Sequence, residues 1–191
     1  MRISSRILAT FVLSGLVLST PLLLAEDKTD EQEANATEVN VGDGALKVTV
    51  PAGWSKIKPT NNIIEAEFKI AAVEGDDDSG RLTMMAASGG AKANIDRWYG
   101  QFKQADGSST KDAAKVSEMD VNDLKVHVVD IKGDYTPPFS AKGKSENYRM
   151  LAAIIEVGKG EIYLKLIGPA KTIGENEKKF KEMVESVKAG K

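Results

Sequence analysis

The chain has 191 residues, with 26 Lys and Arg against 28 Asp and Glu, which is a formal net charge of −2. A slightly acidic chain of this kind offers no broad electrostatic surface for nucleic acid. There is no cysteine, which excludes disulfides, iron–sulfur clusters and thiol nucleophiles. The folded part must therefore depend on a hydrophobic core.

The first 25 residues have the pattern of a secretory signal peptide. Arg2 and Arg6 come before an uncharged run over residues 7–25, and an acidic stretch follows. We expect cleavage after Ala25, which leaves 24 basic against 28 acidic residues, a charge of −4. Leu23 stands where a small residue is usual, and nineteen uncharged residues can just span a bilayer, so an uncleaved anchor is the alternative. Beyond this segment the sequence predicts no membrane insertion.

Residues 26–44 are polar and acidic, with seven acids against Lys28 alone. A stretch with so little apolar surface is typical of a flexible segment. We therefore predict an acidic leader over 26–44 and a single folded domain over 45–191.

Three strands open the predicted domain. Residues 46–50 alternate strictly between apolar and polar, and a Pro-Ala-Gly turn with Trp54 follows. Residues 63–72 alternate in the same way, which predicts a half-buried strand. Residues 81–87 predict a third strand that returns antiparallel after an acidic loop.

Residues 91–107 predict an amphipathic helix on which the rest of the fold depends. Ile95, Trp98, Tyr99 and Phe102 recur at helical spacing and form one apolar face, which needs a sheet to lie on. An aromatic stripe of this kind usually packs in a core, and that is our interpretation of Trp98.

The second half of the chain predicts more strands and a final helix. A hairpin is expected over 114–118 and 124–132, and segments 147–157 and 162–167 are apolar on both faces, which predicts layers on both sides of the sheet. Thr172 with Glu175 fits a capping box at the start of a C-terminal helix. The whole pattern predicts an α+β fold with helices packed on an antiparallel sheet of about seven strands.

Few catalytic arrangements are compatible with the sequence. His127 is the only histidine, it lies in a predicted strand, and no G-x-S-x-G or H-E-x-x-H motif accompanies it, so a structural role is favoured. Gly143-Lys144-Ser145 ends like a phosphate-binding loop, but Pro138 stands where that motif needs glycine and a strand follows instead of a helix.

Two groups of acids deserve a functional and a structural interpretation. Asp76-Asp77-Asp78 fails the calcium-loop pattern, because Arg81 replaces its glycine, so a solvated hairpin tip is favoured over a weak cation site. The strand acids Glu65, Glu67 and Glu156 have polar neighbours, which suggests a solvent face; whether any two meet as a catalytic pair depends on the fold.

The loop 134–145 is the one positive candidate for a functional surface. Tyr135, Pro137, Pro138 and Phe139 combine two aromatic side chains with a stiff diproline, which is typical of a partner-binding loop. The equally weighted alternative is that Phe139 folds back to cover a sheet edge.

Four segments carry a resemblance to a known family. They are Val50-Pro51-Ala52-Gly53-Trp54, the strand 66–70, the helix segment 93–102 and Leu164-Lys165-Leu166-Ile167-Gly168-Pro169 before a helix. With these the chain resembles the secreted bacterial Mog1/PsbP-like (DcrB/PsbP-like) proteins, especially those of planctomycetes, over residues 45–188. The resemblance implies an α/β/α sandwich with an antiparallel sheet. Members of that superfamily are accessory or binding proteins, one assisting photosystem II and another binding a small GTPase, and the family has no catalytic motif to carry over.

The sequence therefore favours an exported, non-enzymatic binding or accessory protein of the cell envelope, without a cofactor or metal and with an envelope protein as partner. The location expected is periplasmic or extracellular. The alternatives are a hydrolase whose carboxylates come together only in the fold, and a weak cation-binding protein.

Overall fold

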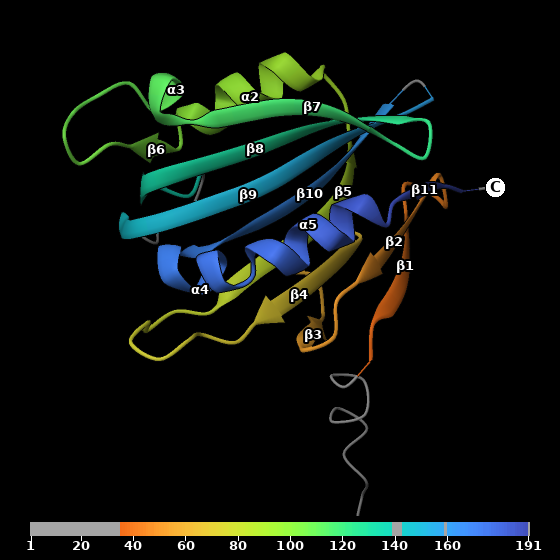
Figure 1. Cartoon of the computed structure of the whole chain (residues 1–191), viewed down its shortest axis with the longest axis horizontal. Helices are drawn as coiled ribbons and strands as arrows, with labels where there is room; N and C mark the ends of the chain where they lie inside the picture. Colours follow the sequence, from red (N-terminus) through yellow and green to blue (C-terminus); the bar gives the residue numbers. More distant parts are fainter. Residues whose placement is uncertain (1–34, 139–142, 159, 191) are drawn as a thin grey trace, which may run out of the picture.

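The computed structural model describes residues 35–138, 143–158 and 160–190. It contains an eight-stranded sheet and a separate three-stranded sheet, both antiparallel, with short helices packed on them (Figure 1). The strands are β1 (Thr37–Val41), β2 (Leu46–Val50), β3 (Trp54–Ile57), β4 (Ala66–Ile70), β5 (Gly80–Ala87), β6 (Phe102–Lys103), β7 (Lys115–Val121), β8 (Leu124–Tyr135), β9 (Ser145–Val157), β10 (Gly160–Pro169) and β11 (Lys188–Ala189). The helices are α2 (Ala91–Tyr99), α3 (Thr110–Ala113), α4 (Ala170–Glu175) and α5 (Glu177–Glu185).

The predicted α+β class is confirmed. In the large sheet the order is β3-β4-β5-β10-β9-β8-β6, and β7 also pairs with β8. The β7–β8 hairpin turns at Asn122 and Asp123, which both have positive φ, as a tight two-residue hairpin turn requires. Strands β9 and β10 lie in the middle of the sheet, which explains why their sequences are apolar on both faces.

The two faces of the large sheet carry separate apolar clusters. Helix α2 covers one face, where Trp98 packs with side chains of β8, β9 and β10. Helices α4 and α5 and the three-stranded sheet cover the other face, around Phe68, Leu164 and Phe180. In Figure 1, α4 and α5 cross in front of the long strands, while α2 lies above β7. The layers expected of an α/β/α sandwich are therefore present, with a small sheet added to one of them.

The predicted leader is wrong at its C-terminal end. Residues 37–41 form β1, which pairs with β2 in the register Val39↔Val48, and both Val39 and Val41 are buried. The prediction rests on the high acid content of 26–44 and does not consider the alternation of Val39 and Val41. These valines are buried only because β1 pairs with the next strand, β2. The folded domain thus begins at Thr37 or before it, and the predicted signal peptide and the first part of the predicted leader lie outside the described residues.

The first predicted helix is shorter than its apolar pattern. Helix α2 ends at Tyr99, Gly100 follows, and Phe102 belongs to β6, where it pairs with Tyr135 of β8. Phe102 is still buried, but as a strand residue. Glycine is a poor helix former. The residues after Gly100 instead form backbone hydrogen bonds with the edge of the sheet, which they could not form in another helical turn. The interpretation of Trp98 as a core residue is confirmed.

The predicted capping box at Thr172 is wrong as well. Helix α4 already begins at Ala170, after Pro169, and its end at Asn176 is followed directly by α5. The amide and the hydroxyl of Thr172 both donate to the carboxylate of Asp76, at 2.8 and 2.6 Å. The first turn of α4 is therefore satisfied by a side chain from a distant loop, which no local pattern can reveal.

Candidate functional site

A cleft of about 680 Å³ lies on the face of the large sheet that carries α2. Its floor comes from β4, β5 and β10, beyond the part of the sheet that α2 covers. One wall is the segment between β3 and β4, with Asn61, Ile63 and Ile64. The opposite wall is the end of β8 and the start of β9, with Tyr135 and Tyr148. A volume of this size is in the range of ligand-binding sites.

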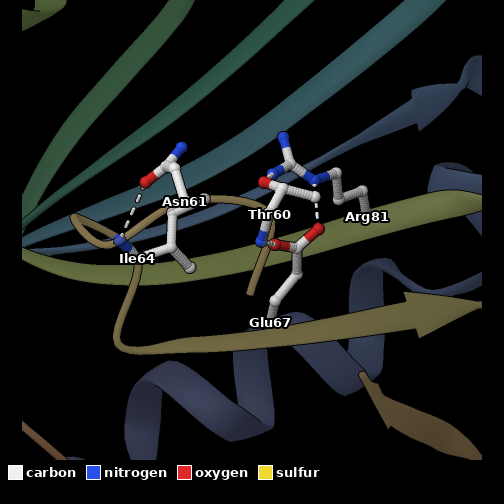
Figure 2. A network of polar contacts seen from close by, with 5 residues as sticks. All are labelled: Thr60, Asn61, Ile64, Glu67 and Arg81. Atoms are coloured by element: carbon white, nitrogen blue, oxygen red, sulfur yellow. Dashed lines mark hydrogen bonds and ion pairs between the residues drawn. The ribbon is translucent and has the colours of Figure 1, made fainter. Parts of the chain in front are cut away.

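A buried carboxylate ties the floor of the cleft to its first wall. Glu67 on β4 is 1% exposed, and it accepts hydrogen bonds from Arg81 Nε at 2.6 Å and from the Thr60 amide at 2.9 Å. Arg81 Nη2 in turn donates to Thr60 Oγ1 at 2.7 Å, which closes the network (Figure 2). Burial raises the pKa of Glu67, but the hydrogen bonds from Arg81 and Thr60 outweigh it and leave this pKa below its usual value. The prediction that Glu67 faces solvent is wrong, because the alternation of β4 turns it toward the covered part of the cleft floor.

The same wall presents apolar side chains to water at its rim. The carboxamide of Asn61 accepts from the amides of Ile63 and Ile64, at 2.9 and 3.2 Å, and so fixes a turn over the sheet (Figure 2 shows the bond to Ile64). That turn leaves Ile63 69% exposed, and Ile57 of β3, which also lines the cleft, is 37% exposed. Two of the three large hydrophobic side chains that are exposed in the described part of the chain thus border this cleft, and the third, Val116, does not line it. Exposed aliphatic groups at a rim are typical of a contact surface for another macromolecule.

The opposite wall contains most of the predicted partner surface. Tyr135, Pro137 and Pro138 line the cleft, whereas Phe139 lies outside the described residues. The ring of Tyr135 packs between those of Phe102, at 5.1 Å, and Tyr148, at 6.1 Å, so this wall is rigid. Burial raises the pKa of Tyr135, partly offset by the charge of Arg81.

A bulge in β8 aims Tyr135 at the cleft. The register with β9 shifts between Gly133 and Tyr135. Gly133 has φ +142°, and a Cβ there would lie 2.6 Å from the carbonyl oxygen of Lys103. Only glycine fits this position, because β6 approaches β8 so closely. The bulge thus allows β6, the strand that follows α2, to pack closely against β8 where Tyr135 turns toward the cleft.

The most unusual group in the cleft is Lys165, at the centre of β10. Lys165 lies on the same face of β10 as Tyr163 and Ile167, which is the face that α2 covers. There its Nζ donates to Gln101 Oε1 at 3.0 Å. The ammonium also lies over the rings of Trp98 and Tyr135, 5.9 and 5.6 Å from their centroids. Burial, with the like charge of Arg81, lowers the pKa of Lys165 to about 8.

Gln101 connects this lysine to the aromatic wall. It lies in the turn between α2 and β6, and while its side chain holds Lys165, its carbonyl oxygen accepts from the Thr136 amide at 2.9 Å. Gln101, two residues beyond the end of α2, therefore positions two parts of the cleft. The arrangement can hold an extended apolar group between the two walls and an anion at the floor.

The acidic loop before β5 has partners within the protein. Asp76 accepts from Thr172, as described above, and Asp78 accepts from the hydroxyl of Tyr148 at 2.6 Å. Burial and the bond to Asp78 raise the pKa of Tyr148 to about 12. The loop is an exposed hairpin tip between β4 and β5, as predicted, but Asp76 and Asp78 also hold α4 and β9 through these hydrogen bonds. Among the described residues no group of three His, Asp or Glu side chains is arranged to hold a metal ion.

A second, smaller hollow of about 270 Å³ contains the strand acid Glu156 beside Glu161, at facing positions of β9 and β10. The imidazole of His127 lies between Glu118 Oε1 at 3.2 Å and Glu156 Oε1 at 2.8 Å. The hydroxyl of Tyr163 donates to Glu161 at 2.9 Å. Each of the facing carboxylates thus has its own hydrogen-bond partner, as in a structural network that holds adjacent strands together.

Sequence reasoning missed the polar floor of the cleft. Arg81, Gln101 and Lys165 carried no motif, and Glu67 was assigned to the wrong environment. The one signal was Lys165 itself, a single charge inside a segment that is otherwise apolar on both faces, since such a residue needs either a partner or a cavity. The predicted loop and the missed floor turn out to belong to one site.

The sequence matches no protein-family model and no curated protein. Solved structures similar to this one include the cyanobacterial PsbP protein (CyanoP) of Synechocystis sp., at 10% identity and TM-score 0.49, over 82% of this chain and 93% of that one. LpqN of Mycobacterium tuberculosis, involved in cell envelope biogenesis, has 9% identity and TM-score 0.49 over 90% and 100% of the two chains. PA94 of Pseudomonas aeruginosa, described as a putative regulator of unknown function, has 10% identity and TM-score 0.45 over 80% and 95%. These likenesses concern the fold alone and say nothing about the contents of the cleft.

The part of the chain that the structure describes includes no helix long and apolar enough to cross a membrane.

Proposed function

We propose that this is an exported, non-enzymatic binding protein whose cleft receives a segment of a partner protein in the cell envelope. The observation that carries the proposal is the pairing of two unlike walls around the cleft. One has exposed aliphatic side chains, Ile57 and Ile63, and the other is a rigid aromatic and proline surface at Tyr135, Pro137 and Pro138. Rigid aromatic anchors opposite exposed aliphatic groups favour a polypeptide as occupant.

Export is proposed from the signal-peptide pattern over residues 1–25, which predicts a periplasmic or extracellular mature protein. Membership of the secreted Mog1/PsbP-like proteins of the planctomycete type is proposed from the motifs at residues 50–54, 66–70, 93–102 and 164–169. Both proposals agree with an accessory role in the envelope, and sequencing of the mature N-terminus, expected at Glu26, tests the first.

The alternative of a carboxylate-based hydrolase is less well supported by the cleft. Among the described residues that line it, Asp78 is the one carboxylate, beside Lys69, Arg81 and Lys165. A pair of carboxylates placed for acid and base catalysis needs two acids in one concave site. The smaller hollow does hold two, Glu156 and Glu161, but each is engaged there, by His127 and by Tyr163. The chemistry of the cleft lining is that of an anion-binding surface.

The test is cross-linking in the native cell from a photoreactive residue at position 57, with mass spectrometry of the adducts. We expect one reproducible envelope protein. The substitution Ile63→Asp should abolish this adduct, because it places a charge on the contact surface while the side chain it replaces is exposed and contributes little to folding. Val116→Asp, an exposed hydrophobic position outside the cleft, is the matched control and should leave the adduct intact. An adduct that survives Ile63→Asp, or that forms equally well from position 116, would contradict the proposal.

A further inference from the structure

We propose that the partner segment presents a carboxylate to Lys165 and Arg81, next to an aliphatic side chain that contacts Ile57 and Ile63. This inference rests on the proposed function, since it specifies what the cleft recognises in its partner. The partner is thus an acidic, aliphatic stretch of polypeptide. The proposed function alone requires neither a carboxylate in the partner segment nor a particular place for it in the cleft.

Lys165 is in an unusual state for a charged side chain. Within the described part of the chain its ammonium forms no ion pair, and its hydrogen bond goes to the neutral amide of Gln101. Its neighbours across the strands, Thr83 and Ala152, are uncharged. A half-buried ammonium held only by an amide and by aromatic faces is incompletely compensated, because burial removes water without supplying an opposite charge.

The carboxylate of Glu67, which lies two strands from Lys165 because Thr83 pairs with both residues, is already engaged. Glu67 lies under the floor, and both of its oxygens accept hydrogen bonds from Arg81 and Thr60. The side chain of Arg81 remains 43% exposed and lines the cleft. The register of β5 and β10 pairs Lys165 with Thr83 and Ile167 with Arg81, so Arg81 is the diagonal neighbour of Lys165 on the same face, and both side chains line the cleft. Two cations placed in this way can share one anion.

The rest of the lining is chemically complementary to an acidic and aliphatic segment. Lys69 adds a further cation, while Asp78, the one carboxylate in the described lining, accepts from Tyr148 at the opposite wall. An acidic side chain above Lys165 and Arg81 would form charge-assisted hydrogen bonds in a partly desolvated site, where they are stronger than at an open surface. The exposed isoleucines of the rim meanwhile offer apolar contact to a neighbouring residue of the same segment. Charge and shape together thus select an acidic residue beside an aliphatic one.

Binding of such a segment should be linked to protonation. An anion beside Lys165 favours the charged form, so the pKa of Lys165 rises from about 8 on binding and the protein takes up protons near pH 8. The affinity should fall as the pH rises above 8. The charged and titratable groups that line the cleft around this lysine are Arg81 of β5, Lys69 of β4, Tyr135 of β8, Tyr148 of β9 and Asp78 of the loop before β5. Burial raises the pKa of both tyrosines, so they do not titrate in this window.

The experiment uses synthetic six-residue peptides with capped ends, in which one position is Asp, Glu, Asn or Gln and the others vary among Leu, Val, Phe, Ala and Gly. The mature protein should enrich peptides with an acid beside Leu or Val. For the best binder, calorimetry at about pH 8 in two buffers of different ionisation enthalpy should show proton uptake. Replacing its acid by the matching amide should weaken binding at least tenfold.

Lys165→Met should remove both the preference for the acid and the proton uptake, while Lys178→Met, at an exposed position of α5, should change neither. Lys165→Arg keeps the charge and should retain the preference for the acidic peptide over its amide. It serves as the control for a general effect of substitution at this site. Peptides that bind the cleft equally well as acid and amide would overturn this inference and leave the proposed function standing. If no peptide binds and the cross-link from position 57 is also absent, the proposed function itself fails, and with it this inference.

Discussion

Replacing Lys165 by methionine should stabilise the protein, and by an amount that depends on pH. The folded state holds the pKa of this lysine at about 8, against 10.5 for an exposed lysine. Because folding depresses the pKa, the unfolded chain binds more protons between these two values, so the free energy of unfolding of the wild type rises as the pH increases through this window. The cost of the charged form is fully present below about pH 8. At 1.36 kcal/mol per pKa unit it amounts to about 3 kcal/mol at neutral pH and to about 1.4 kcal/mol at pH 9.5.

Water still reaches the half-buried ammonium, so we expect about half of this effect. The free energy of unfolding of the variant minus that of the wild type should therefore change by about 1 kcal/mol from pH 7 to pH 9.5. Urea denaturation at several pH values in this range measures it, and taking the difference between the two proteins cancels the other titrating groups. Loss of the bond to Gln101 and new packing by methionine shift the whole curve without changing its slope. Lys178→Met, whose side chain is 88% exposed, should give a flat difference. A flat difference for Lys165→Met as well would refute the desolvation of this lysine.

Three further substitutions test contacts at the site and on the opposite face of the sheet, where Arg149 of β9 lies between Asp130 of β8 and Glu177 of α5. Glu67→Gln should lower the free energy of unfolding by about 2 kcal/mol at neutral pH, because charge-assisted hydrogen bonds to Arg81 are lost. Since folding lowers the pKa of Glu67, this loss should shrink in denaturation curves as the pH falls below about 4.5. A loss that does not depend on pH would contradict the interpretation of Glu67 as a charged partner of Arg81. Arg149→Leu should cost about 3 kcal/mol, because it leaves Asp130, its bidentate partner at 2.8 Å, without its charge pair; a neutral effect in thermal unfolding would show that the pair contributes nothing. Gly133→Ala should cost at least about 2 kcal/mol, since its Cβ would meet a backbone oxygen, and a variant as stable as the wild type would mean that β6 moves away easily.

Local patterns were sufficient for most of the elements. The alternation over 46–50 and 63–72 and the apolar segments 147–157 and 162–167 predicted strands that the structure contains, although β4 is shorter than predicted, at Ala66–Ile70. Burial of one or both faces of a strand leaves a direct record in the sequence. The predicted helices also exist, although their ends were misplaced at Gly100 and Ala170. Helix ends depend on which groups satisfy the terminal amides and carbonyls, and here a distant loop and a sheet edge do so.

The candidate site was predictable only in part. Tyr135, Pro137 and Pro138 were recognised because stiff aromatic segments are locally visible, and the structure places them along a cleft. Their contacts with Tyr148 and with the turn at Gln101 were not visible, since they join residues far apart in the chain.

By itself, the sequence determined the class of the fold, the lack of thiol chemistry and the export pattern, since each depends on composition or on short-range periodicity. Only the tertiary structure decided that β1 belongs to the domain, that Glu67 is buried, and that Lys165 and Arg81 form a cationic floor between two walls. The physical reason is that the environment of a charged side chain is set by the groups that other strands bring beside it. The same lysine would be an ordinary solvated residue if β4 and β5 were not placed where they are, or if α2 extended one turn further.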